Sequence, residues 1–357
     1  MNQFPLPALR PTQTPLSSAF VRPETPPPLF SSLHSRRSAL ACLGGGLAWA
    51  LAQPAQAAWN VIKLGEREYI TAQNIKDFYR FPALERSGPG VTFRSPKLVM
   101  RLRSGSQEMF VNGVKFMLSL PVSSHGKDVL ISRVDLSKLI DPVLRPSHIA
   151  TARPFTTVVI DPGHGGHDGG ARGVFGKEAS YALDTSIRLA KQLQARGLRV
   201  VMTRTSDTYP SLPRRVEIGN ATPNSIFVSV HFNSGGSSAQ GVETYALAPQ
   251  GTNRSRKEGN ENDGVRFQGN TRDSENIALA TAVHAAMLYH LKAVDRGILR
   301  DRWFLLKGIQ SPGILVEGGF VTSPVECAKI NTPQYRELLA QSIAAGIVNF
   351  RKAISRR

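Results

Sequence analysis

The second half of the chain alternates short apolar segments with longer amphipathic ones, and this alternation limits the fold more than any other feature. The segment 156–161 reads TTVVID and predicts a buried strand, and 178–196 carries apolar residues on one helical stripe that Gly197 would end. Further predicted strands are 198–203, 225–232, 242–248 and 313–320, and further predicted helices are 212–221, 275–291 and 335–353. Such alternation predicts an α/β fold, a twisted and mostly parallel sheet with helices on both faces.

Four ionisable side chains stand at or near the ends of these predicted elements. His164 follows the first strand in VIDPGHGG, and His231 ends the third strand in SIFVSVHFN. Glu178 opens the first long helix, and Glu317 lies near the end of the last strand, in GILVEGG. Because the carboxyl ends of parallel strands meet at one edge of a sheet, we expect these side chains to approach one another there.

Two imidazoles and one carboxylate are a known ligand set for catalytic zinc, and they leave a fourth position for water. The chain has two cysteines, Cys42 and Cys327, which are too few for a thiolate zinc site, so a metal here needs nitrogen and oxygen ligands. A second carboxylate can take a proton from water during attack on a carbonyl, and Glu317 suits this role as the base. The residues therefore predict metal-assisted hydrolysis.

The motifs VIDPGHGG, GKE, SVHFN with GVETYAL, and ILVEGGF resemble, in order and at similar separations, those of the zinc-dependent amidase type 3 family, the N-acetylmuramoyl-L-alanine amidases. The similarity covers roughly residues 156–354. It implies that His164, Glu178 and His231 bind one Zn²⁺ ion and that Glu317 is catalytic. It also implies that the substrate is peptidoglycan or a muropeptide, in which the amide between N-acetylmuramic acid and L-alanine is hydrolysed.

Four residues are candidates for supporting roles. Asp161 and Glu243 would orient a ligand histidine through its second ring nitrogen, or would make an ordinary turn or salt bridge. Arg204 and Arg215 would contact muropeptide carboxylates, or would pair with internal acids. The sequence leaves both alternatives open for each pair.

Three further residues lie close to the predicted ligands in sequence. Ser229 and Asn233 flank His231 and would shape the rim of the site. His167 comes three residues after His164, and it either approaches the metal or substrate or has no role in the site.

The segment 249–272 is the main irregular insertion, and it is rich in Asn and Gly and poor in apolar residues. In some relatives a helix at this place covers the zinc and is displaced by an activator protein. This composition does not predict a stable blocking helix. The segment is either a lid over the substrate or a solvated surface loop, and an activator protein remains a candidate partner.

The first 57 residues predict a signal peptide. A Pro- and Ser-rich leader is followed by Arg36 and Arg37, a weakly apolar Gly/Ala/Leu run and the small-residue site 55–57. The paired arginines are typical of twin-arginine export, so we expect a protein exported to the periplasm or cell envelope, with no stable membrane span after processing. A retained membrane anchor and a bipartite organelle transit sequence are the alternatives.

The chain is strongly basic, with 44 Lys and Arg against 26 Asp and Glu and a formal net charge of +18. Such a charge attracts polyanions, which include nucleic acid, acidic lipid and anionic cell-wall polymer. Export disfavours nucleic acid as the natural partner. Charge by itself does not choose between lipid and cell wall.

Residues 58–150 read as a small β-rich module, separate from the predicted catalytic part 151–357. Ser104-Gly105, Asn112-Gly113 and His125-Gly126 predict hairpin turns between its strands. The module resembles the copper amine oxidase N-terminal-like domain, but its histidines form no cluster that would bind copper. Two rival functions for the whole chain are a catalytically silent peptidoglycan-binding protein on an amidase scaffold and a zinc peptidase that cuts within the peptide stem.

Overall fold

A computed structural model describes residues 59–255 and 263–355 of the chain. The predicted signal peptide, residues 1–57, lies outside the described residues, as does the middle of the insertion, residues 256–262. Within the described ranges, no helix is both long and apolar enough to cross a lipid bilayer.

Six strands of the C-terminal part lie side by side in the order β11-β10-β12-β15-β13-β14. The first four run parallel to one another, β13 is antiparallel to β15, and β14 is again parallel to β13. The expected mostly parallel sheet is therefore confirmed. Their bounds are β10 Thr157–Pro162, β11 Arg199–Met202, β12 Ser225–Asn233, β13 Val242–Leu247, β14 Asp295–Asp301 and β15 Gly313–Phe320.

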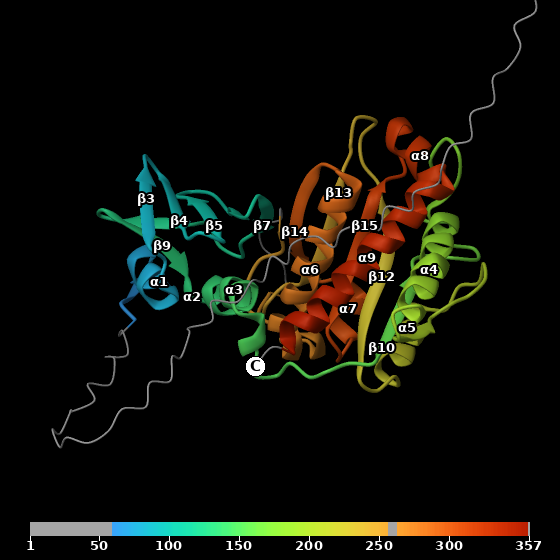
Figure 1. Cartoon of the computed structure of the whole chain (residues 1–357), viewed down its shortest axis with the longest axis horizontal. Helices are drawn as coiled ribbons and strands as arrows, with labels where there is room; N and C mark the ends of the chain where they lie inside the picture. Colours follow the sequence, from blue (N-terminus) through green and yellow to red (C-terminus); the bar gives the residue numbers. More distant parts are fainter. Residues whose placement is uncertain (1–58, 256–262, 356–357) are drawn as a thin grey trace, which may run out of the picture.

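Helices cover both faces of this sheet, as Figure 1 shows. Alternate residues of β10 explain why, because Val158 and Ile160 belong to the core packed against α4 and α9, whereas Val159 packs against α5 and α7. Both faces are apolar, so the strands read as nearly continuous apolar runs. The helices are α4 Glu178–Gln194, α5 Leu212–Asn220, α6 Asp273–Leu291, α7 Phe304–Gly308, α8 Pro324–Asn331 and α9 Pro333–Ile354, with the 3₁₀ helix η3 Gln268–Arg272 before α6.

All the predicted strands and helices of the C-terminal part occur, with ends within two residues of the prediction. Three further elements, β14, α7 and α8, were not predicted from the sequence. Strand β14 reads DRGILRD, which is mostly polar, and it is recognisable as a strand only beside β13. The helices α7 and α8 are short, so neither gives a clear helical stripe of apolar residues.

The N-terminal module is β-rich, as expected, and the three predicted turn pairs lie at or between strand ends. Four strands form a sheet in the order β1-β2-β9-β8, and β3 to β7 form consecutive antiparallel hairpins. The bounds are β1 Val61–Leu64, β2 Arg67–Thr71, α1 Ala72–Tyr79, β3 Ala83–Ser87, β4 Gly90–Arg94, β5 Val99–Arg103, β6 Glu108–Val111, β7 Val114–Met117, β8 Ser123–His125, β9 Asp128–Ser132, α2 Arg133–Asp135, η1 Leu136–Ile140, α3 Asp141–Leu144 and η2 Pro146–His148.

The module and the C-terminal part share one sheet, which the sequence analysis did not anticipate. Strand β7 pairs with β14, with Phe116 opposite Ile298, so β3 to β7 extend the six strands into an eleven-stranded sheet. At the same boundary Arg300 is fully buried and donates to the Lys138 carbonyl oxygen. Helix α6 is buried on several sides because α3 and η1 of the module pack against it as well as α9. Strand β14 is therefore not a free edge.

Candidate metal centre

The loop after β10 brings an imidazole to the carboxyl edge of the sheet. His164 has a φ of 57°, and Gly165 and Gly166 also have positive φ, so the chain turns sharply just beyond the strand. Glycine is required at Gly163 for a different reason, because a Cβ atom there would lie 2.4 Å from the ring of His231. The glycines of VIDPGHGG therefore allow the backbone to pass close enough for two imidazoles to meet.

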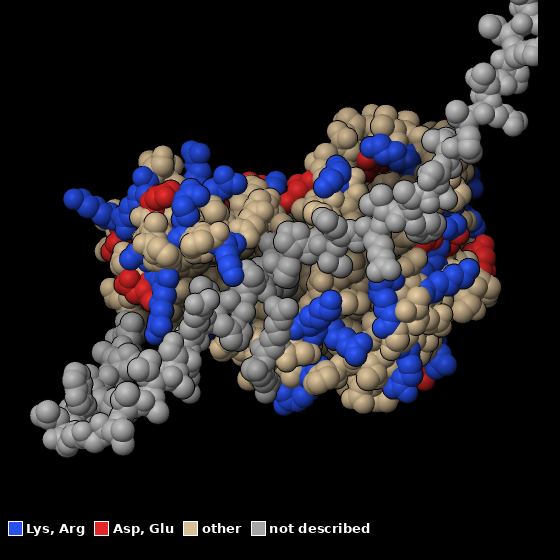
Figure 2. All heavy atoms as spheres, in the orientation of Figure 1, with Lys and Arg blue, Asp and Glu red and all other residues tan. Residues whose placement is uncertain are grey.

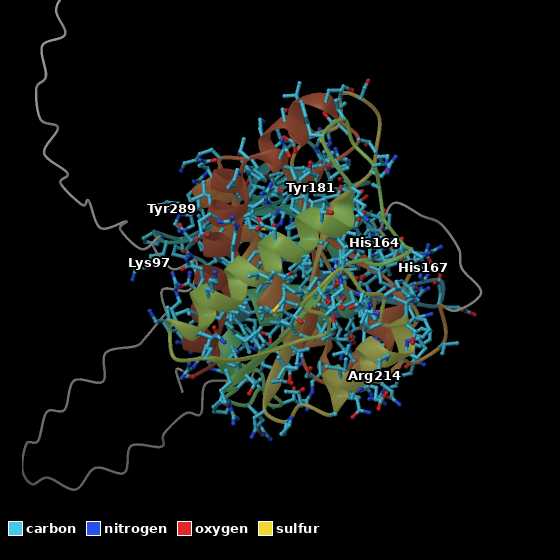
Figure 3. The ribbon with its side chains drawn as sticks, turned by 90° about the vertical axis from the view of Figure 1, so that its right-hand side faces the viewer. Lys97, His164, His167, Tyr181, Arg214 and Tyr289 are labelled. Atoms are coloured by element: carbon cyan, nitrogen blue, oxygen red, sulfur yellow. The ribbon has the colours of Figure 1, made fainter. Side chains whose placement is uncertain are left out.

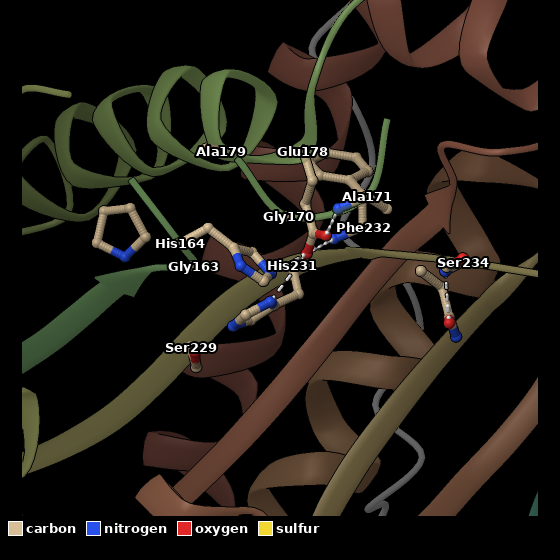
Figure 4. Close-up of polar contacts among 12 residues, drawn as sticks. Gly163, His164, Gly170, Ala171, Glu178, Ala179, Ser229, His231, Phe232 and Ser234 are labelled. Carbon is tan, nitrogen blue, oxygen red and sulfur yellow. Dashed lines mark hydrogen bonds and ion pairs between the residues drawn. The ribbon is translucent and has the colours of Figure 1, made fainter. Parts of the chain in front are cut away.

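Three predicted ligands converge at this edge, as Figure 4 shows. The Oε1 atom of Glu178 lies 3.1 Å from Nε2 of His164 and 2.9 Å from Nδ1 of His231. One candidate ligand atom from each residue lies within 4.8 Å of the other two. Ligands about 2.0–2.1 Å from a tetrahedral zinc ion are about 3.3 Å apart, so these two separations are close to those of a zinc site. The donor set fits zinc.

Outer hydrogen bonds hold two of these ligands in place. The Nδ1 atom of His164 lies 2.8 Å from the Asp168 carboxylate, which leaves Nε2 facing Glu178. The backbone N–H groups of Ala171 and Phe232 donate to the two oxygens of Glu178. Asp168 was missed from sequence, although an acid four residues after His164 in HGGHDGG was a visible signal. Such partners fix the orientation of a ligand ring and raise its basicity.

The charges at the site favour a bound cation. Burial alone would raise the pKa of Glu178, but hydrogen bonds and charge from His164 and His231 outweigh burial and hold it well below the ordinary value. Burial alone would lower the pKa of His164, yet Glu178 and Asp168 outweigh burial and raise it. A buried carboxylate that stays ionised needs positive charge close by. Protonated histidine rings or a bound metal ion would supply this charge.

Glu317 lies beside the three candidate ligands on the neighbouring strand. It is the register partner of His231 across β12 and β15, so the two side chains share one face of the sheet. The carboxylate is buried, and its Oε2 atom has no hydrogen-bond partner among the described residues. Burial first, and then the negative charges of Glu178 and Glu243, raise the pKa of Glu317 well above its usual value. A carboxyl group in this state is suited to exchange a proton.

Glu243 continues the same row of side chains onto β13, where it is the register partner of Glu317. Its oxygens accept hydrogen bonds from Asn233 at 2.7 Å, from Tyr245 at 2.8 Å and from Arg296 at 2.7 Å. The contact with Arg296 is a salt bridge, so Glu243 matches the second alternative left open by the sequence. Asn233 therefore ties the end of β12 to β13, and its predicted role at the rim of the site stays a prediction.

Asp161 lies near the end of β10 and is fully buried. Its carboxylate accepts hydrogen bonds from Thr203 at 2.6 Å, Ser229 at 2.7 Å and Arg215 at 3.0 Å. Asp168, and not Asp161, is the acid on the second ring nitrogen of His164. Asp161 instead forms a salt bridge with Arg215, which is the other alternative that the sequence left open. Ser229 has the same internal role.

Both candidate arginines are buried and bind the end of β10 and the loop that carries His164, residues 163–170, which we call the metal loop. Arg215, with 1% of its surface exposed, donates to the carbonyl oxygens of Pro162 and His164 as well as to Asp161. Arg204 donates to the carbonyl oxygens of Pro162 and Gly163. The two guanidinium groups therefore hold the backbone that carries His164, which is the internal alternative.

We expect Arg215→Met to destabilise the fold strongly. The substitution leaves the Asp161 carboxylate buried without its cation, and breaking a buried pair in this way costs about 3–5 kcal/mol. The neighbouring Arg214→Met is the matched control, because Arg214 pairs with Glu217 at the surface, where such pairs contribute about 1 kcal/mol or less. Urea denaturation curves would compare the two free energies of unfolding. Equal values would contradict the structural role assigned to Arg215.

His167 lies close to His164 but belongs to the surface. Figure 3 shows both rings at the same end of the molecule, with His167 on the outer side. The His167 ring packs against Tyr209 with their centroids 4.3 Å apart, and the side chain is exposed. It is not a member of the ligand cluster found among the described residues.

The fold and the site together define an α/β protein with a His-Glu-His cluster that could hold a metal ion at the carboxyl edge of a mostly parallel sheet. A family model described as N-acetylmuramoyl-L-alanine amidase matches residues 158–349, more than half of the chain. The chain belongs to this family.

Individual relatives show the same extent of similarity. An uncharacterised cell wall amidase of Bacillus anthracis is 31% identical over 202 residues, and the amidase LytC of Bacillus subtilis is 29% identical over 195 residues. Each match covers 54% of this chain and 35% of the relative, so the chain spans about a third of the length of these two proteins. The solved structure of the amidase AmiC2 of Nostoc punctiforme is 30% identical, covers 55% of this chain and 97% of that one, and has a TM-score of 0.47.

Proposed function

We propose that the protein is a zinc-dependent N-acetylmuramoyl-L-alanine amidase that acts on peptidoglycan. The observation that carries the proposal is the meeting of His164, Glu178 and His231 beside Glu317, a buried carboxyl group with an unpartnered oxygen. Family membership supports the bond that is cleaved, the amide between the lactyl group of N-acetylmuramic acid and L-alanine.

The proposed mechanism assigns one task to each side chain. His164, Glu178 and His231 would hold the zinc ion, with Asp168 fixing the orientation of His164. Bound zinc would polarise the amide carbonyl and lower the pKa of water from 15.7 toward about 7. Glu317 would accept the proton of the attacking water and deliver it to the departing alanine nitrogen, which is a poor leaving group unless it is protonated.

The products of a digest distinguish this function from its two rivals. We expect the protein, incubated with purified sacculi and Zn²⁺, to release glycan strands without peptides and intact stems that begin with L-alanine. Mass spectrometry of the soluble fraction would identify both products. Stems shortened from within would indicate the zinc peptidase instead, and binding to the sacculi without release would indicate a silent binding protein.

The location and partners of the protein form a second part of the proposal. The relatives named as cell wall amidases support a location at the cell envelope, to which residues 1–57 would direct export as a signal peptide. Figure 2 shows lysine and arginine side chains over both the module and the C-terminal part of one face, which would favour retention on an anionic wall. We assign residues 58–150 to an accessory module that holds the wall or positions the catalytic part, 151–357. An activator protein and the lid role of the 249–272 segment remain part of this proposal.

A further inference from the structure

A small hairpin rises directly before the metal ligand Glu178. Residues Arg172 and Lys177 form a bridge, and the Gly173 N–H donates to the Gly176 carbonyl oxygen at 2.9 Å. This geometry places Val174 and Phe175 at the tip of the turn, where 69% and 54% of their surfaces are exposed. We call residues 172–177 the Val-Phe hairpin.

The base of the Val-Phe hairpin is fixed to the metal centre and to the core. Ala171 donates to Glu178 Oε2 at 2.9 Å and accepts from the Glu178 N–H at 2.8 Å. At Gly173 an added Cβ atom would lie 2.2 Å from the Val321 carbonyl oxygen and 2.5 Å from the Cys327 sulfur, so the hairpin packs tightly against the start of α8. The tip is exposed although its support is rigid.

Val174 and Phe175 are unusual residues for the tip of an exposed turn. Gly, Pro, Asn, Asp and Ser dominate turns because they supply the required backbone conformations or hydrogen bonds. Here two adjacent apolar side chains face water, although burial of apolar surface is favourable. Local conflicts of this kind are expected at functional sites. Something that covers Val174 and Phe175 during function would resolve this conflict.

The proposed substrate is a candidate to cover the tip, because the tip lies close to the candidate metal centre. Phe175 is three residues before Glu178. Consecutive Cα atoms are 3.80 Å apart, so the Cα atoms of Phe175 and Glu178 lie within about 11 Å of each other. One side of the scissile amide carries uncharged N-acetylated sugars, whose ring C–H groups form an apolar face, and the other side carries a peptide with carboxylates. An aromatic ring with a large apolar surface and no charge suits the sugar face.

Accepting the proposed amidase function, we propose that the Val-Phe hairpin binds the glycan strand, with the Phe175 ring packed on a sugar ring beside the scissile bond. The hairpin thereby places the lactyl amide over the site held by His164, Glu178 and His231. Phe175 is a positioning residue for the polymeric substrate, and it takes no part in proton transfer.

Binding to the separate halves of the substrate tests this inference. In the Glu317→Gln background, which blocks turnover, we expect Phe175→Ala to weaken binding to peptide-free glycan strands about tenfold and to leave binding of free stem peptides unchanged. Phe175→Tyr should retain glycan binding. Phe304→Ala is the matched control, because Phe304 is a phenylalanine of similar exposure, 46%, on α7. In the active protein, Phe175→Ala should raise KM for sacculi by the same factor with little change in kcat.

The alternative results each overturn the inference. A loss confined to stem peptides would place the peptide at the tip, and unchanged binding of both halves would leave the tip to a partner protein or to solvent. Inactivity of the wild-type protein on sacculi would refute the amidase proposal separately, since the glycan-binding comparison does not depend on turnover.

Discussion

Replacing Glu317 with glutamine is expected to reduce peptidoglycan cleavage by about 10²–10⁴-fold, because the amide has the shape of the acid but cannot accept and deliver the proton. The rate of stem release from sacculi under saturating Zn²⁺ measures this loss. Glu317 lies outside the three-residue ligand cluster, so the variant should still bind one zinc ion per chain.

The same variant should not be less stable than the wild type. Burial and the negative charges of Glu178 and Glu243 oppose ionisation of Glu317, and a neutral amide removes this repulsion. A melting temperature equal to or above that of the wild type would separate lost chemistry from lost folding. Glu217→Gln, at an exposed position on α5, is the control and should cleave normally. Retained cleavage by Glu317→Gln would reject Glu317 as the proton carrier.

Removing one imidazole is expected to have the second large effect. His231→Ala deletes one of the three ligands, and the zinc affinity should fall by far more than the 10–100-fold loss that typically follows removal of an outer partner. Asp168→Ala removes such a partner, the acid that orients His164, and should show that intermediate loss. Titration of metal-free protein with Zn²⁺ against a competing chelator would rank the variants.

His167→Ala provides the matched control for this series. Its ring packs on Tyr209 at the surface and lies outside the ligand cluster, so zinc affinity should be that of the wild type. If His231→Ala bound zinc as tightly as the wild type, the proposed ligand set would be wrong. Equal zinc affinities of Asp168→Ala and the wild type would instead contradict only the orienting role assigned to Asp168.

Local sequence patterns predicted most C-terminal elements, because a buried strand shows a run of apolar residues and a helix shows an apolar stripe. Strand β10 is apolar at its central positions, Val158 to Ile160, which helices cover on both faces, and α4 carries its apolar residues on one stripe. Strand β14 has no such pattern, since it gains its neighbours from β13 and from β7, which is far away in the sequence. Pairing between distant segments is decided by the whole fold.

The site divides in the same way. The four candidate side chains lie at or near strand and helix ends that the sequence marks, so their approach could be expected from the rule for parallel sheets. The outer contacts could not be expected from the sequence. The pair of Asp161 with Arg215, and the bonds from Arg204 to the loop carbonyl oxygens, depend on how β10, β11 and α5 pack together.

The sequence alone determined the α/β class and the amidase family, and it predicted the four candidate residues of the site, because periodicity and motif spacing are local properties. Tertiary structure decided which acid orients His164, that both candidate arginines support the metal loop, and that the module continues the same sheet. These depend on contacts between residues far apart in the chain, whose partners are chosen by packing and by the cost of leaving buried polar groups unpaired.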